Sequence, residues 1–179
     1  MRRPHILAGL LVTALAGLLL ASGTPANATH PVAGSRIADL DARSFATASA
    51  TTQLVTMQPP STVVGPQHWT LSDTGQGTKV TNIATGGCLG LPDRWITVNL
   101  PPVVQQPCRN RATDYWRIVS TTTDSVIFQN VGHGGCMGLD STASTSSTQS
   151  VATQQYSSSQ LYVLPCRSDD PNQHFRLLT

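Results

Sequence analysis

Glutamate is absent from this sequence, and lysine occurs once, as Lys79. Charged residues make up 11% and aromatic residues 5% of the 179 residues, whereas serine, threonine, glycine and proline are frequent. Residues that favour helices are therefore scarce. Because 39% of the residues are hydrophobic, a chain of this length can still form a core. The composition predicts a folded, all-β, loop-rich domain rather than a long disordered chain.

Residues 1–28 have the three parts of a cleavable export signal. Arg2 and Arg3 form a positive start, Ile6–Leu20 is apolar, and Ala26-Asn27-Ala28 is a small-residue cleavage site. The apolar run is too short to span a bilayer comfortably, and no second run of membrane length follows it. We therefore expect a secreted, extracellular protein without a membrane span.

The charge and the motifs narrow the range of functions. The formal net charge of +2 becomes zero when Arg2 and Arg3 leave with the expected signal, so neither nucleic acid nor an anionic membrane is indicated as a partner. The mature chain has no G-x-S-x-G, no H-E-x-x-H and no glycine loop of the kind that binds phosphate. No pair of aspartates is placed by a glycosidase motif. The expectation is a protein that is not an enzyme and needs no cofactor.

Four cysteines lie in the mature region, at Cys88, Cys108, Cys136 and Cys166. An even number in an exported chain indicates two disulfides, for which three pairings are possible. Successive cysteines are 20, 28 and 30 residues apart and there is no C-x-x-C, which is unlike the short ligand hairpins of zinc sites. No metal site is predicted.

An internal repeat is the most informative feature of the sequence. Residues 82–91 and 130–139 align without a gap, and both follow N-[IV]-x-x-G-G-C-[LM]-G-L. The later steps of the repeat also align: Gln106-Pro107-Cys108-Arg109 with Leu164-Pro165-Cys166-Arg167, and Tyr115-Trp116-Arg117-Ile118 with His174-Phe175-Arg176-Leu177. A third unit is visible in its second half only, as Gln58-Pro59-Pro60 and Gln67-His68-Trp69.

The repeat predicts three units of about four short strands each, over approximately residues 29–72, 73–120 and 121–179. Residues 29–52, the first half of the first unit, carry little apolar pattern and are poorly assigned. The Gly-Gly before each repeated cysteine fits a tight turn with a positive φ at one or both positions. One unit has too few apolar residues to bury a face, so the three are expected to share a core.

The repeated steps resemble the ricin-type β-trefoil lectin domain, whose units carry G-x-C-[LM]-x-[LV], a later P-C step and a closing Q-x-[WF]. The resemblance covers residues 53–179 and implies an all-β trefoil with disulfides inside the units, Cys88 with Cys108 and Cys136 with Cys166. Asn82 to Leu89 is also similar to the N-x-x-T-G-x-C-[LM] step of the binding subunits of cytolethal distending toxin.

Lectins of this family bind sugar with an Asp two residues after the first Cys, an aromatic ring two residues before the second Cys, and an Asn-Gln pair before the closing aromatic. The middle unit has Gly90, Gln106 and Thr113-Asp114 at these positions, so none matches. The third unit has Gly138 and Leu164 in place of the Asp and the ring, but it retains Asn172-Gln173. The resemblance therefore implies that any sugar pocket lies in the third unit.

Other residues are candidates for completing that pocket. Asp140 lies two residues beyond the expected carboxylate, and Tyr162 or Tyr156 is a candidate for the ring. The alternative is that the Asn172-Gln173 amides cap a turn and brace the closing strand. Trp95 is outside the repeated core positions and is either an exposed contact ring or a loop anchor.

Two functions from different classes remain open. The first is a secreted, lectin-like protein that binds a glycan or polysaccharide. The second is a toxin-like binding or protein-interaction subunit, in which another secreted protein is the partner and the trefoil is a scaffold with degenerate sugar sites. A protease inhibitor is a third reading, disfavoured because the Ser/Thr/Gln tract at 141–159 resembles a flexible loop rather than a rigid one.

Overall fold

The computed structural model of the protein describes residues 34–94, 100–140 and 159–179. Within them it contains twelve short strands, two 3-10 helices and no α-helix. The first unit holds β1 (Arg36–Ala38), β2 (Phe45–Ala48), β3 (Val55–Gln58) and β4 (Trp69–Thr74). The second holds β5 (Gly77–Asn82), β6 (Cys88–Gly90), β7 (Val104–Gln106), η2 (Ala112–Asp114) and β8 (Trp116–Ser120). The third holds β9 (Val126–Asn130), β10 (Cys136–Leu139), β11 (Leu161–Leu164), η4 (Pro171–Gln173) and β12 (Arg176–Leu178).

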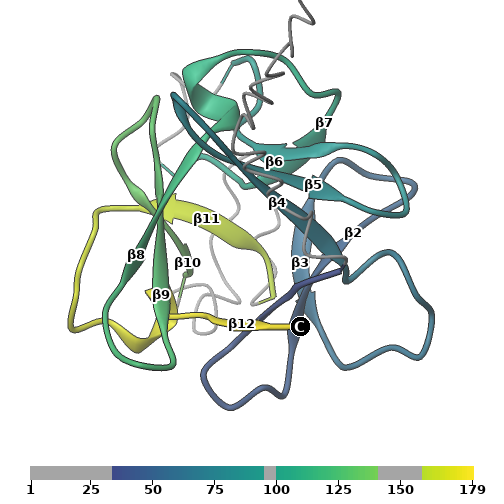
Figure 1. The fold of residues 1–179 in the computed structure, drawn as a ribbon, viewed down its shortest axis with the longest axis horizontal. Coiled ribbons are helices and arrows are strands. Elements are labelled where there is room, and N and C mark those ends of the chain that lie inside the picture. Colours follow the sequence, from purple (N-terminus) through teal and green to yellow (C-terminus); the bar gives the residue numbers. More distant parts are fainter. Residues whose placement is uncertain (1–33, 95–99, 141–158) are drawn as a thin grey trace, which may run out of the picture.

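Six strands, two from each unit, close into a ring. Antiparallel pairing of β4 with β5, β8 with β9, and β12 with β1 joins neighbouring units. The ring is completed inside the units by three equivalent pairs of residues: Ser35 with Trp69, Thr78 with Trp116, and Val126 with Phe175. Figure 1 shows the three units, coloured in chain order, as neighbouring sectors. The predicted trefoil of three four-stranded repeats is confirmed.

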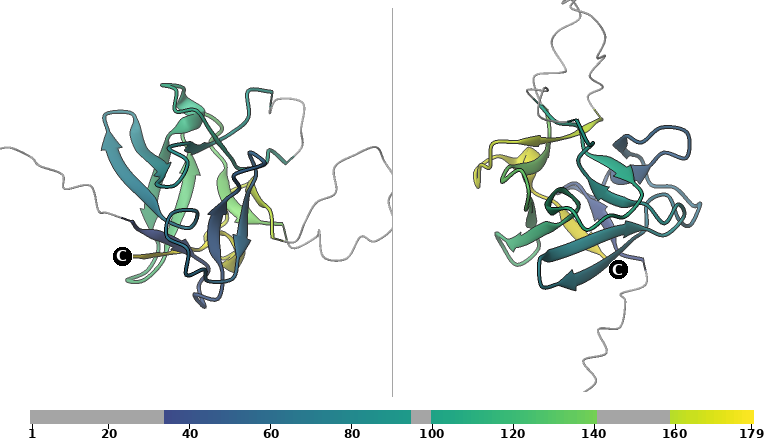
Figure 2. Two further views of the ribbon diagram at one scale, coloured as in Figure 1. Left: turned by 90° about the vertical axis from the view of Figure 1, so that its right-hand side faces the viewer. Right: turned by 90° about the horizontal axis from the view of Figure 1, so that it is seen from above.

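Sequence alternation explains how β5 faces the interior. Along β5, Thr78, Val80 and Asn82 are buried and the residues between them are half-buried, as expected for a side-chain period of two. The C-terminus lies beside the start of the described chain because Leu178 pairs with Arg36 (Figure 2). The predicted signal, residues 1–28, lies outside the described residues.

The core is built around the closing residue of each unit. Trp69, Trp116 and Phe175 are all buried, and the Phe128 ring meets those of Trp116 and Phe175 edge-on at centroid distances of 6.5 and 6.0 Å. The indole N–H of Trp69 donates to the Ala46 carbonyl at 2.9 Å. The expected shared core is therefore present.

The first half of the first unit, which carries little apolar pattern, forms β1 and β2. The Trp116 indole donates to the Leu89 carbonyl just as that of Trp69 donates to Ala46, so Ala46 and Leu89 are equivalent. Phe45 therefore occupies the place of the repeated cysteine. Asp39 replaces the repeated asparagine, and its carboxylate accepts from the Arg43 N–H at 2.8 Å. These substitutions removed the repeat signature but preserved the turn.

The two disulfides join Cys88 with Cys108 and Cys136 with Cys166, as the family resemblance implies. The first glycine of the pair before Cys88 and before Cys136 adopts a left-handed backbone conformation. Gly86 and Gly134 have φ of 68° and 82°, which confirms the predicted positive φ at the first glycine of each pair.

The hairpins β2–β3, β6–β7 and β10–β11 meet around the axis of the trefoil. The Val55 N–H donates to the Val103 carbonyl, and the Val103 N–H donates to the Leu161 carbonyl at 2.8 Å. The buried Gln160 Nε2 lies 2.9, 3.2 and 3.4 Å from the carbonyl oxygens of Leu161, Val55 and Val103. One amide group therefore serves an equivalent carbonyl from each unit.

The Gln160→Ala substitution tests this central contact. It removes the only side-chain amide that the structure shows near all three carbonyls within the described residues, and we expect it to lower the free energy of unfolding by about 1 to 3 kcal/mol. Urea unfolding measures the change. Gln76→Ala, in the exposed β4–β5 turn, is the matched control and should cost less than about 0.5 kcal/mol. Equal stability of the two variants would contradict the role of Gln160.

A second test concerns the disulfide of the third unit. The Cys136→Ala, Cys166→Ala variant opens a bridge that spans 30 residues, and the expected loss of stability is about 3 to 4 kcal/mol from chain entropy. Denaturant unfolding measures it, and peptide mapping without reductant should recover both pairs from the unchanged protein. An unchanged unfolding midpoint would show that the bridge contributes no stability.

Candidate functional site

Three equivalent positions follow from the trefoil symmetry. The residue after Ala46, Leu89 or Met137 corresponds to the expected carboxylate of a sugar site, and it is Thr47, Gly90 or Gly138. We call these the carboxylate positions. Each lies on the second strand of its unit and faces the segment that precedes the closing aromatic residue.

The carboxylate position of the third unit is closed by packing. A Cβ atom placed on Gly138 would lie 2.9 Å from Gln173 Cγ and 3.0 Å from Leu164 Cδ1. It would also lie 3.2 Å from the Asn172 carbonyl oxygen. Leu164 and Gln173 therefore occupy the space that an aspartate side chain would need.

The Gln173 side chain is buried and bonded to backbone at both ends. Its Nε2 donates to the Pro165 carbonyl at 2.9 Å, and its Oε1 accepts from the Arg167 N–H at 2.9 Å. The equivalent Gln67 bonds in the same way, at 2.8 Å to the Pro59 carbonyl and at 2.9 Å from the Ser61 N–H. This glutamine thus braces the closing loop in both units.

Asn172 lies beside Gln173 but in a different environment. Its backbone N–H donates to Asp170 Oδ1 at 3.0 Å, which caps η4. Its side chain is half-buried and forms no hydrogen bond to another described residue. Of the retained pair, Asn172 is therefore the residue whose amide is available to a ligand.

The other predicted site residues differ in their surroundings. Asp140 directly follows β10 and is half-buried. Tyr162 on β11 pairs with Gly138 on β10. Tyr162 is 3% exposed, so its ring is not accessible from the surface in this structure. Tyr156 and Trp95 lie outside the described residues.

The carboxylate position of the middle unit is closed by a different set of groups. A Cβ on Gly90 would lie 2.9 Å from the Thr113 carbonyl oxygen, 3.1 Å from Asp114 Oδ1 and 3.2 Å from Gln106 Nε2. Gln106 Nε2 donates to Asp114 Oδ1 at 2.9 Å. The Arg109 N–H donates to Asp114 Oδ2 at 3.2 Å. In the first and third units the equivalent backbone N–H donates to the side-chain oxygen of Gln67 or Gln173.

The middle unit carries a cluster of ion pairs beside its carboxylate position. Arg111 pairs with the buried Asp114 at 3.2 Å and is also in contact with Asp93, which Arg109 binds at 3.0 Å. A carboxylate with no exposed surface needs such partners, because burial without them is costly. Sequence reasoning missed this cluster because Asp93 is separated from Arg109 and Arg111 in the chain.

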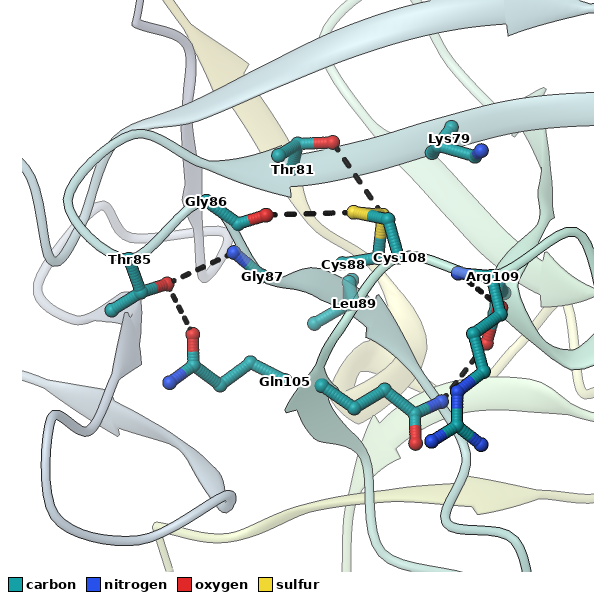
Figure 3. Close-up of a disulfide and its surroundings, with 12 residues drawn as sticks. Lys79, Thr81, Thr85, Gly86, Gly87, Cys88, Leu89, Gln105, Cys108 and Arg109 are labelled. Carbon is teal, nitrogen blue, oxygen red and sulfur yellow. Dashed lines mark hydrogen bonds between the residues drawn. A yellow bond between two sulfur atoms is a disulfide. The ribbon is translucent and has the colours of Figure 1, made fainter.

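The turn beside the Cys88–Cys108 disulfide is tied to strand β7 (Figure 3) and, through it, to the first unit. The Thr85 hydroxyl accepts from the Gly87 N–H at 3.2 Å and hydrogen-bonds to Gln105. Gln105 Nε2 in turn donates to the Ser49 carbonyl at 2.9 Å. These contacts hold the units in register rather than forming a catalytic arrangement.

In the part of the chain that the structure describes, no group of three or more His, Cys, Asp or Glu residues is placed to hold a metal ion. None of the helices there has the length and apolar character needed to cross a membrane.

The fold and the repeat match a known family. The profile of the family described as ricin-type beta-trefoil lectin domain-like matches residues 65–156. The chain belongs to this family. Among curated proteins no relative of the chain is found.

Solved structures with the same fold come from several kinds of protein. The Macrolepiota procera ricin B-like lectin in complex with lactose is 12% identical, with a TM-score of 0.60 over 80% of this chain and 93% of that one. Cytolethal distending toxin from Actinobacillus actinomycetemcomitans is 13% identical, with a TM-score of 0.60 over 83% and 92%. An exo-beta-1,3-galactanase from Clostridium thermocellum is 12% identical, with a TM-score of 0.65 over 82% of this chain but only 30% of that enzyme.

Restoring the family aspartate tests whether the third position is closed. Gly138→Asp should destabilise the protein by about 1 to 3 kcal/mol, since its side chain would overlap Leu164 and Gln173. Thr47→Asp at the equivalent position, which already holds a side chain, should cost less. Denaturant unfolding of both variants measures the difference, and adding Leu164→Ala to Gly138→Asp should recover part of the loss. Equal stability of the two Asp variants would show that the third position is open.

Proposed function

We propose that this protein is an exported, non-catalytic trefoil that binds a glycan beside Asn172 in the third unit. Its membership of the lectin-like family supports binding as the general function. The lactose complex of a lectin with the same fold supports a saccharide as the ligand. The two disulfides and the signal-like pattern of residues 1–28 support export.

The observation that carries the proposal is the available amide of Asn172. An amide donates and accepts, so one side chain can bond two hydroxyl groups of a sugar. The Gln173 side chain holds the closing loop in place by hydrogen bonds to the backbone of Pro165 and Arg167, and this pre-organises Asn172. Asp140, at the end of the neighbouring strand β10, supplies a carboxylate acceptor, and Tyr156 is the sequence-based candidate for a ring.

A second candidate function has its own support. The carboxylate positions of the middle and third units are filled, as expected of sugar sites that have decayed. Val63, Val64 and Ile83 are exposed, and Gly65 lies against Ala84 so that the two apolar segments adjoin. An exposed apolar patch of this kind suits a protein partner. The fold shared with cytolethal distending toxin is consistent with such a scaffold role.

A glycan-array and insoluble-polysaccharide screen of the disulfide-intact mature protein tests the primary proposal. Asn172→Ala should weaken binding at this site about tenfold, the size expected for one or two hydrogen bonds to the ligand. Asn110→Ala, exposed in the corresponding loop of the middle unit, should leave binding unchanged. The saccharide should be recovered intact.

Absence of binding by verifiably folded protein would contradict the glycan proposal. Capture of a defined secreted protein that is lost on Val64→Asp would then support the scaffold function. Cleavage of a bound saccharide would contradict the non-catalytic role.

A further inference from the structure

A groove at the end of the barrel lies apart from the carboxylate positions. Its larger hollow has a volume of about 350 Å³ and is lined by Leu40, Thr122, Asp124, Ser125, His174 and Arg176. A second hollow of about 180 Å³ shares Thr122, Asp124, Ser125 and Arg176 with it, so the two are continuous. The larger hollow falls within the range of small ligand sites, about 300 to 1,000 Å³.

The connection between β8 and β9 creates this groove. Five residues, 121–125, join these strands, whereas two residues join β4 and β5. Ser125 stands where the other units have Gly34 and Gly77, whose φ values are 84° and 137°. Ser125 does not share that positive φ. The longer loop with its different backbone brings Asp124 beside Arg176 of β12, and within the described residues the β4–β5 connection has no such arrangement.

One wall of the groove is held rigid by His174. Its Nε2 lies 2.9 Å from the Ser168 carbonyl oxygen, which can only accept, so Nε2 carries the proton. In the neutral ring Nδ1 is then the acceptor, and it lies 3.1 Å from Thr121 Oγ1 and 3.3 Å from Ser125 Oγ. The loop that carries Asp124 is thereby tied to the closing segment of the unit.

Two charged side chains in the groove are not engaged with each other. Arg176, on β12, and Asp124 form no side-chain hydrogen bond or ion pair with any residue in the described ranges. A guanidinium offers donors only and a carboxylate offers acceptors only. The groove thus presents a donor wall and an acceptor wall whose charges cancel, next to the apolar side chain of Leu40, which is 39% exposed.

We propose that this groove is a second saccharide site, which binds one pyranose of a neutral glycan. Asp124 accepts bonds from the sugar hydroxyls, Arg176 donates to its oxygens, and Leu40 covers its C–H face. Cancellation of the two charges favours a neutral sugar over an acidic or basic one. The inference rests on the proposed glycan function and adds to it, because two sites on one chain raise the avidity for a polymer.

Amide chemical-shift mapping locates the ligand directly. Lactose and cellobiose as neutral probes, and sialyllactose as an acidic one, are titrated into the mature ¹⁵N-labelled protein. The expected result is saturable shifts at Ser125, Val126 and Arg176 with a neutral probe. Arg176→Ala should weaken the binding seen at these amides about tenfold or more, as for loss of a bond to a charged group.

Arg117→Ala is the matched control, because Arg117 follows Trp116 on β8 just as Arg176 follows Phe175. It removes the same charge at the equivalent position, which is exposed on β8 and lies outside the groove, and should leave the shifts unchanged. Asp124→Asn, which keeps the size of the side chain, should weaken binding as well. Thermal unfolding of each variant checks that the fold is retained.

The outcomes separate the two proposals. Shifts confined to the surroundings of Asn172, or groove shifts with undiminished affinity in Arg176→Ala, would overturn the groove site and leave the proposed function standing. Groove shifts with sialyllactose alone would overturn the neutral ligand class. No binding of any saccharide here or in the screen would overturn both proposals.

Discussion

The closing aromatic residue of each unit is the contact on which this trefoil depends. Trp69, Trp116 and Phe175 sit at equivalent positions and are buried. Each pairs with a residue near the start of its own unit and so completes the ring. The two indoles also bond to the second strand of their own unit, at Ala46 and Leu89. Packing and polar satisfaction thus coincide at one position, so three units that are individually too small acquire a common interior.

The three units share the same backbone arrangement, but they differ in the side chains around the carboxylate position. The carboxylate position holds a threonine in the first unit, an ion-paired cluster around Asp114 encloses it in the second, and Leu164 with Gln173 fills it in the third. The same frame therefore carries three local chemistries. The fold is preserved because Gln67 and Gln173, and Asp114 in a modified form, continue to brace the loop before the closing aromatic.

The proposed binding relies on polar side chains that form no hydrogen bond with other described residues. The third unit offers them in two places: the Asn172 amide, and Arg176 with Asp124 in the groove. Each would form few contacts with a sugar, and single-site affinity would be weak. The two proposed sites on one domain would offset that weakness for a polymeric ligand.

The sequence by itself determined the all-β class, the three units and the presence of two disulfides, because glycines, cysteines and closing aromatics recur at spacings that only a repeat explains. The pairing of the cysteines was implied by the family resemblance. The sequence could not reveal the first half of the first unit, where Phe45 and Asp39 perform the repeated roles with other side chains. Only the tertiary structure showed that Asn172 is half-buried while Gln173 and Tyr162 are buried, since exposure depends on neighbours distant in the chain. It also brought Asp124 beside Arg176, because their 52-residue separation is closed by the pairing of Val126 with Phe175.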